Sequence, residues 1–354
     1  MANRALGAPP LSGPQPVAKP EVAADSETIA APLLRAGSSR VADGVFHLAM
    51  LACGLCVLAL VGLIVYELIS GSKLSWHAFG LKFFFRSEWD PVNEQFGALP
   101  FVFGTLVSSI LALVIAVPLA IGVAVFITEM SPRWLRGPLA FTTELLAAIP
   151  SVIYGLWAIF VLVPLLRQYG EPFLARYFGW TSGIAHRFGF QGPFEGPPYG
   201  IGMLAAGIIL AIMVVPIVSS ITREVMTAVP QQQREAVLAL GATRWEMIRT
   251  GVLRNARAGI LGGVILGLGR ALGETMAVTM VIGNRPEIAS SLFAPGYTMA
   301  SVIANEFSEA TGNTYLSALI EIGLALFIVT IIVNILAQFL VWTVTRGTVA
   351  RSHA

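Results

Sequence analysis

The sequence predicts an all-α integral membrane protein with six transmembrane helices. Hydrophobic residues make up 56% of the chain and charged residues only 12%, whereas a soluble domain carries about 25% charged residues. The chain also contains six apolar runs that are each long enough to cross the roughly 30 Å hydrocarbon core of a bilayer. The net charge of +2 says little about partners, because basic residues in a membrane protein mostly report its orientation. Nucleic-acid binding is therefore not implied.

The elements follow in order along the chain. Residues 1–44 are rich in Ala, Pro, Ser and Gly and are predicted to be a disordered tail. Residues 45–345 form the membrane domain, and residues 346–354 form a second tail. The predicted spans are Val45–Tyr66, Phe101–Ile127, Leu145–Leu166, Gly200–Ile221, Ala258–Ile282 and Leu316–Val341. The first run is too long and begins too late to be the apolar core of a secretory signal peptide.

The distribution of Lys and Arg predicts the orientation. An even number of spans places both termini on one side of the membrane. The tails, residues 129–144 and residues 222–257 hold 14 Lys and Arg, and the alternate loops hold 7. Cytoplasmic segments carry the excess of basic residues, so we expect both termini in the cytoplasm. The outer loops, residues 70–100, 167–199 and 283–315, are long enough to meet an external partner.

The fifth span contains two charged residues, Arg270 and Glu274, inside an apolar run. A charge at the bilayer centre costs about 2.5 to 3.5 kcal/mol on insertion scales, so it normally faces protein or a water-filled pathway. At about 100° per residue, both residues would share one helical face with Gly259, Gly263 and Gly267. Such small-xxx-small spacing lets another helix approach closely. We therefore expect the pair to point into the helix bundle.

The chemistry of this pair suits an anion that carries a proton. Arginine presents a planar fork of charged donors that matches phosphate oxygens. Phosphate retains a hydroxyl proton near neutral pH, so Glu274 could accept a hydrogen bond from it and repel an ion without one. The alternative is an intramembrane salt bridge between Arg270 and Glu274 that only neutralises itself, because residues four apart on a helix are within reach.

Three further polar residues are candidates for the same pathway. Glu144 lies at the cytoplasmic entry of the third span, Ser151 follows Pro150, and Glu321 lies one turn into the sixth span. Each could equally cap a helix or bond a neighbouring side chain. The four histidines have no ligand spacing, so a metal site is not expected. The three lysines are not preceded by glycine, so the chain has no P-loop for ATP. It also has no nucleophile elbow.

The loop at residues 222–257 is predicted to form two short helices. Pro230 suits the first turn of the first helix and Gly241 its end, and Thr243 with Glu246 makes a capping box for the second. A DNA-binding helix-turn-helix has a similar outline, but this loop is tethered between two membrane spans. A docking surface for a cytoplasmic protein fits better.

Two stretches resemble a known family. Glu235-Ala236-Val237 followed by Gly241 is similar to the EAA loop of ABC importer permeases, although Gly251–Arg254 departs from the Ile-x-Leu-Pro with which that pattern ends. Residues 267–284, GLGRALGETMAVTMVIGN, resemble a permease subunit of the bacterial phosphate-specific ABC importers. Further similarity lies in residues 88–90, 104–106, 144–155 and 304–307, so the resemblance covers roughly residues 45–345.

This resemblance implies a type I ABC importer permease fold and transport of inorganic phosphate across the bacterial inner membrane. Glu235, Ala236 and Gly241 would then contact a dimeric cytoplasmic ATP-binding subunit, which holds the ATP, so this chain itself would carry no cofactor and catalyse no reaction. The implied partners also include a second, homologous permease subunit, a periplasmic phosphate-binding protein and membrane lipid. A permease for sulfate or molybdate, a secondary anion transporter or channel, and a structural or sensory subunit remain the alternatives.

Overall fold

The computed structural model describes residues 40–187 and 192–349. These residues fold into helices and connecting segments, with two isolated β-bridges. The chain divides into two units at Leu63. The first unit contains the beginning of α2 (Arg40–Gly71), whose side chains from Asp43 to Leu63 are all exposed. Residues 40–44 of the predicted tail therefore begin a helix, and residues 1–39 and 350–354 lie outside the described part of the chain.

The prediction of six membrane-crossing helices is confirmed. The helices that are long and apolar enough to span are Asp43–Gly71, Leu99–Met130, Ser151–Phe178, Met203–Ala228, Arg244–Gly273 and Asn313–Thr343. The second to sixth spans lie in the second unit. The second span is α4 (Leu99–Val125) with η2 (Phe126–Met130), and the third runs from α6 (Ser151–Trp157) to α8 (Glu171–Phe178). The fourth is α10 (Met203–Ala228), the fifth runs from α12 (Arg244–Glu246) to α13 (Arg254–Gly273), and the sixth lies in α16 (Asn313–Val349).

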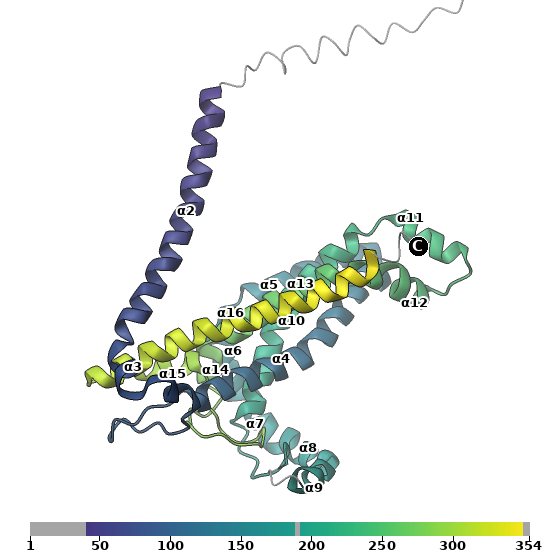
Figure 1. The fold of residues 1–354 in the computed structure, drawn as a ribbon. Helices are drawn as coiled ribbons and strands as arrows, with labels where there is room; N and C mark the ends of the chain where they lie inside the picture. The colour runs from purple at the N-terminus through teal and green to yellow at the C-terminus, as the bar shows by residue number, and fades with distance from the viewer. Residues whose placement is uncertain (1–39, 188–191, 350–354) are drawn as a thin grey trace, which may run out of the picture. The chain divides into compact units, whose positions relative to one another are not determined.

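The core of the second unit consists of α4, α10 and α13, which pack against one another (Figure 1). The close approach predicted from the small-xxx-small spacing is confirmed. A Cβ atom on Gly259 would lie 2.5 Å from the Val225 side chain of α10, and one on Gly267 would lie 2.8 Å from the side chains of Val214 and Val218. Only glycine allows α13 to lie this close to α10.

The third span differs from its prediction. We expected one helix from Leu145 to Leu166, but α5 (Arg133–Ala148) ends first and α6 begins at Ser151. Ile149 and Pro150 between them are extended, with ψ of 130° and 139°. Proline disfavours the helical conformation of the residue before it, which accounts for the position of the interruption. The new helix then continues to Phe178, into the predicted outer loop.

The fifth span was also predicted wrongly at both ends. It begins at Arg244, fourteen residues before the predicted start at Ala258, and α13 ends at Gly273. Glu274 is extended, with ψ of 128°, and a short helix, α14 (Met276–Thr279), follows. Arg270 and Glu274 therefore do not lie four residues apart on one helix, and the shared helical face that we expected does not exist.

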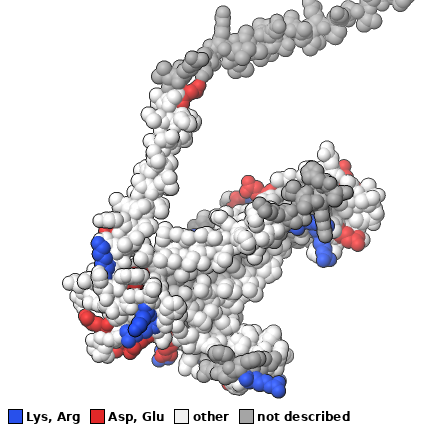
Figure 2. All heavy atoms as spheres, viewed as in Figure 1, with Lys and Arg blue, Asp and Glu red and all other residues white. Residues whose placement is uncertain are grey.

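Two apolar clusters position the remaining segments. One surrounds α10, and the other joins α15 (Met299–Glu306) and α16 to the segment before α4 around the fully buried Phe83, Phe96 and Phe101. Glu306 fixes this second cluster by accepting hydrogen bonds from Trp89 Nε1 and the Tyr315 hydroxyl. In the view of Figure 2, charged side chains gather toward the ends of the second unit, and the surface between them is almost free of charge.

Candidate substrate path and coupling surface

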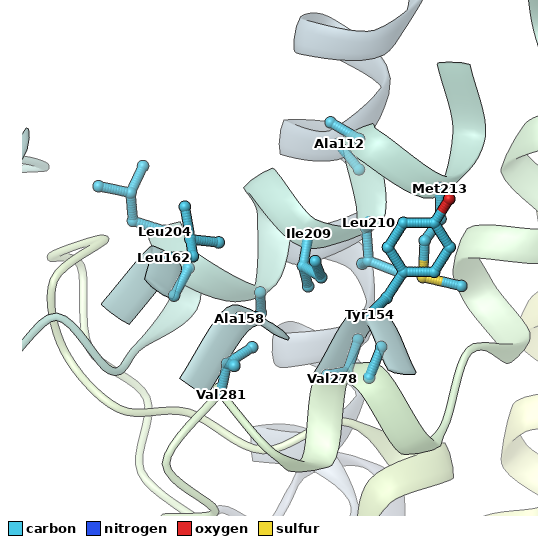
Figure 3. Close-up of a cluster of buried hydrophobic side chains, with 14 of the residues drawn as sticks. Ala112, Tyr154, Ala158, Leu162, Leu204, Ile209, Leu210, Met213, Val278 and Val281 are labelled. Atoms are coloured by element: carbon cyan, nitrogen blue, oxygen red, sulfur yellow. The ribbon is translucent and has the colours of Figure 1, made fainter. Parts of the chain in front are cut away.

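The helices that follow the breaks in the two predicted spans meet at one place, which we call the helix junction. It is the contact of α6, which follows the interruption at Ile149–Pro150, with α14, which follows the interruption at Glu274–Thr275. A Cβ atom on Gly155 would lie 2.5 Å from Met280 Sδ and 3.1 Å from Ala277 Cα. Figure 3 shows the apolar side of the junction, where Tyr154 of α6 and Val278 of α14 share one buried cluster with residues of α10. Interrupted helices of this kind line substrate sites in many transporters.

Arg270 lies in the last turn of α13, beside the helix junction. Its side chain is exposed to solvent. It lies close enough to the hydroxyl group of Tyr154 to act on it electrostatically. Tyr154 is itself held across the first interruption, because its hydroxyl donates to the Leu146 carbonyl at 2.8 Å. Among residues 40–187 and 192–349, no ion pair or hydrogen bond engages the Arg270 guanidinium.

Glu274 has a different environment from Arg270. Its side chain is buried, with 9% of the residue exposed, and Oε1 accepts a hydrogen bond from the Ala277 N–H at 3.4 Å. This carboxylate therefore sits at the start of α14. The self-neutralising salt bridge that sequence alone left open is absent from the described residues, because no ion pair there joins Arg270 to Glu274. Glu274 therefore does not occupy the N–H donors of the Arg270 guanidinium.

The three further candidates lie in separate places. Ser151 is the first residue of α6 and is half-buried at the helix junction. Glu144 lies on α5 and forms an ion pair with Arg223 of α10. Glu321 is 0% exposed, and within the described residues neither of its carboxyl oxygens has a hydrogen-bond partner. Ser75 lies close enough to act on this carboxyl group, and it belongs to α3 (Lys73–Phe79), which packs against α16.

Helices lie on both sides of Gly241, as predicted. Pro230 directly precedes α11 (Gln231–Ala239), Gly241 adopts φ of +84°, and Thr243 and Glu246 form both bonds of the predicted capping box. The second helix is not a separate element, however, since it begins the fifth span. Glu235, Ala236 and Gly241 are exposed, and the neighbouring Leu240 is 88% exposed. The loop therefore presents these residues, and the turn at Gly241, to solvent.

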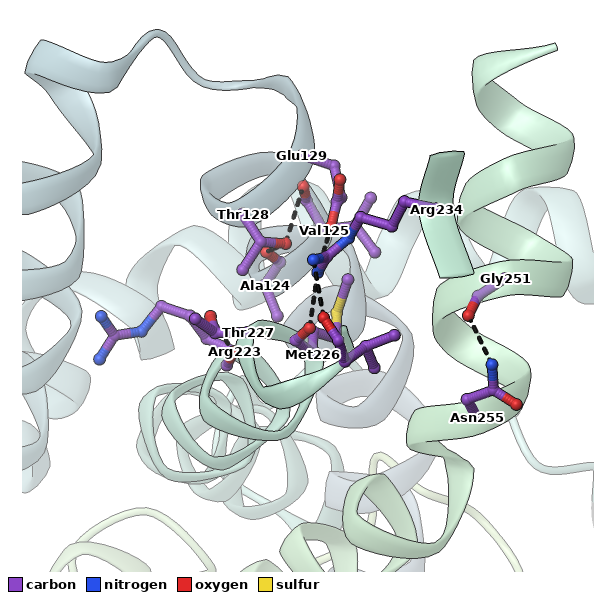
Figure 4. Close-up of polar contacts among 11 residues, drawn as sticks. Ala124, Val125, Thr128, Glu129, Arg223, Met226, Thr227, Arg234, Gly251 and Asn255 are labelled. Carbon is purple, nitrogen blue, oxygen red and sulfur yellow. Dashed lines mark hydrogen bonds and ion pairs between the residues drawn. The ribbon is translucent and has the colours of Figure 1, made fainter. Parts of the chain in front are cut away.

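Arg234 is a residue that the sequence analysis missed. It lies on α11, and its guanidinium donates to the carbonyls of Met226 and Val229, at the end of α10, at 2.7 and 2.8 Å. The same group forms an ion pair with Glu129 of η2 at 3.2 Å (Figure 4). The exposed loop is thereby fixed to two membrane helices at once. Its position directly before Glu235 was the only signal in the sequence, because Glu129 is more than a hundred residues away.

Six membrane-crossing helices, with a break before the third and another after the fifth beside Arg270, and an exposed helical loop are the features of a multi-pass membrane permease. The chain belongs to the family of binding-protein-dependent transport system inner membrane components, whose model matches residues 116–346. It is therefore a multi-pass protein of the inner membrane.

Relatives and a solved structure agree with this assignment. The chain is 46% identical over 306 residues to the phosphate transport system permease protein PstC of Mesorhizobium japonicum, covering 86% of this chain and 92% of the relative. It is 45% identical to the protein of the same name from Xylella fastidiosa, with the same shares covered. A bacterial ABC transporter involved in the import of the acidic polysaccharide alginate matches 87% of this chain and 100% of its own, with a TM-score of 0.56 and 16% identity. The predicted importer permease fold is thus confirmed.

Proposed function

We propose that this chain is the permease subunit of an ATP-driven importer of inorganic phosphate and forms one half of the translocation pathway. The observation that carries the proposal is the identity of 46% and 45%, over 86% of the chain, to permeases named for phosphate transport. The guanidinium of Arg270, exposed and without a partner among the residues that the structure describes, supports it, because a planar set of charged donors suits phosphate oxygens.

Within this proposal, Arg270 and Glu274 are the substrate-path residues. Arg270 would donate to the phosphate oxygens. Glu274 holds the Ala277 N–H with Oε1 and would use Oε2 to accept a hydrogen bond from the P–OH group. Ser151 is a further candidate because it starts α6 at the helix junction. Glu144 and Glu321 are secondary candidates, since Glu144 is paired with Arg223 and Glu321 faces α3.

The energy for transport would come from another chain. We propose that a dimeric cytoplasmic ATP-binding subunit docks on Glu235, Ala236 and Gly241 and holds the ATP, so that this chain binds no cofactor. A periplasmic phosphate-binding protein would deliver phosphate to the outer loops. A second, homologous permease would complete the pathway, because a single arginine hardly balances a doubly charged anion away from water. Both termini would lie in the cytoplasm, as the 14 to 7 distribution of basic residues favours.

Uptake of radiolabelled phosphate by cells that depend on this transporter tests the proposal. Arg270→Gln should lower the uptake rate about 10- to 100-fold, because two charge-assisted hydrogen bonds are lost. Arg270→Lys should retain part of the activity, since the charge remains. Arg176→Gln, an exposed arginine on α8, is the matched control and should transport normally. Copurification of the other subunits verifies that each variant assembles.

The anion specificity is tested with the same cells. Unlabelled sulfate and molybdate should not compete with phosphate uptake, and Glu274→Gln should reduce the discrimination against sulfate, because the repulsive carboxylate is gone. Full uptake by an assembled Arg270→Gln transporter would overturn the role of the pair. If sulfate or molybdate competed when present at the same concentration as phosphate, the chain would be a permease for another oxyanion. Uptake that survives ATP depletion would instead indicate a secondary transporter.

A further inference from the structure

A group of arginines that does not include Arg270 lines a cavity of about 1050 Å³. The cavity is bounded by η2 and the start of α5, by the end of α10, and by α11 and α12. These elements lie at the end of the bundle that the distribution of basic residues places in the cytoplasm. The charged residues that line it are Arg133, Arg136, Arg223, Arg234, Arg244 and Glu129.

Within residues 40–187 and 192–349, carboxylates neutralise two of the five arginines. Arg234 pairs with Glu129, and Arg223 pairs with Glu144. Arg133, Arg136 and Arg244 are exposed, and no ion pair engages them within the described residues. In the described part of the chain, three cations without a carboxylate partner therefore line one cavity. Like charges held together in this way repel one another unless an anion lies between them.

The guanidinium of Arg136 is also oriented. Its Nε donates to the Ser131 carbonyl at 3.0 Å, which leaves its two terminal amino groups for another acceptor. Guanidinium groups bind phosphate oxygens with paired, charge-assisted hydrogen bonds. The wall of the cavity also carries Trp245, which is 62% exposed. A tryptophan of this kind suits the boundary between headgroups and hydrocarbon.

The surface beside the cavity carries exposed apolar side chains of α5, which suit contact with membrane lipid. α5 leads from the cavity into the membrane domain, and along it Trp134, Phe141 and Leu145 are 77%, 65% and 54% exposed. This apolar strip could receive acyl chains, while the arginines receive the headgroup. Basic pockets between transmembrane helices at the cytoplasmic face bind anionic lipid headgroups elsewhere.

We propose that the arginine-lined cavity binds the phosphate group of an anionic phospholipid from the adjacent membrane leaflet. The bound headgroup would offset the repulsion among Arg133, Arg136 and Arg244 and would brace α11, which forms one wall of the cavity. The lipid would thus stabilise the loop on which we expect the ATP-binding subunit to dock. The lipid site does not depend on which anion the transporter carries.

Native mass spectrometry of the assembled transporter tests this site, with phosphatidylglycerol as the probe. Arg133→Gln with Arg136→Gln should weaken phosphatidylglycerol binding about 30-fold, or five- to sixfold for each arginine. The same two positions changed to lysine should lose less, because the charges remain. Arg249→Gln with Arg254→Gln is the matched control, since both arginines are exposed and neither lines the cavity.

A second arm distinguishes the possible sources of the phosphate group. The transporter is placed in phosphatidylcholine nanodiscs with or without phosphatidylglycerol, and hydrogen exchange of residues 231–239 is measured. Phosphatidylglycerol should slow this exchange in the parent protein but not in Arg133→Gln with Arg136→Gln. Slowing by inorganic phosphate alone would assign the cavity to the free ion and overturn the lipid proposal. Equal phosphatidylglycerol affinity of Arg133→Gln with Arg136→Gln and of the control, Arg249→Gln with Arg254→Gln, would also overturn the lipid proposal. The cavity would then be assigned to acidic side chains of the ATP-binding subunit.

Discussion

Replacing Arg234 with methionine should loosen α11 from the membrane helices, because one guanidinium fixes α11 to both η2 and α10. Methionine keeps an apolar stem of similar length. It removes the ion pair with Glu129 and the two hydrogen bonds to the carbonyls of Met226 and Val229. The variant therefore isolates the polar contacts of this side chain from its packing.

The expected cost follows from burial. The side chains of Glu129 and Arg234 are 11% and 14% exposed, so the abandoned carboxylate is poorly hydrated. Removing one partner of a buried ion pair costs about 3–5 kcal/mol. Both groups retain some solvent access, so the lower end, about 3 kcal/mol, applies. Since 1.36 kcal/mol corresponds to a factor of ten, the locally opened form of α11 should become roughly 160 times more populated.

Hydrogen exchange of the assembled transporter measures this population. Peptides that cover residues 231–239 should exchange about 160-fold faster in Arg234→Met than in the parent protein. Arg249→Met, an exposed arginine outside these contacts, is the control and should leave the exchange of α11 unchanged. Glu129→Gln combined with Arg234→Met should recover part of the protection, because no unpaired charge then remains. Unchanged exchange in Arg234→Met, or a double variant as open as the single one, would refute the proposed linkage.

Three further predictions concern other contacts. Gly155→Ala should lower the stability of the transporter by about 1–3 kcal/mol, measured by thermal unfolding, because its Cβ would lie 2.5 Å from Met280 Sδ. Gly241→Val should weaken binding of the ATP-binding subunit, measured by copurification, because φ of +84° strains a β-branched residue. The Gly192 N–H, and to a smaller extent His186, hold the pKa of Glu195 below its ordinary value of 4.5. The contact of Glu195 with α9 (Trp180–Arg187) should therefore persist at neutral pH and be lost as the pH falls through that depressed pKa, which limited proteolysis detects.

Matched variants make each of these outcomes decisive. Gly122→Ala should be harmless, since nothing lies within 4 Å of its Cβ position, and equal stability of the two alanine variants would contradict the tight contact at the helix junction. Gly241→Asn should bind better than Gly241→Val, because asparagine tolerates positive φ. Glu195→Gln should be cleaved at neutral pH as readily as the parent protein is at low pH. Cleavage of the parent that does not vary with pH would rule out the carboxylate link.

Features that depend on residues close together in the chain could be predicted from the sequence. Length and apolarity of each run gave the six spans, because backbone groups in a bilayer must be satisfied within the helix. The spacing of Gly259, Gly263 and Gly267 gave the face on which α13 meets α10. Thr243 and Glu246 gave the capping box, and Gly241 gave the turn that needs positive φ.

The tertiary structure alone decided the features that join distant parts of the chain. Apolarity continues through residues 258–282, so composition could not reveal that α13 stops at Gly273 and separates Arg270 from Glu274. The pairing of Arg234 with Glu129 and the grouping of five arginines around one cavity also arise from helices far apart in sequence. Hydrophobic periodicity fixes which face of a helix is buried. Which charges then meet depends on how the helices pack in three dimensions.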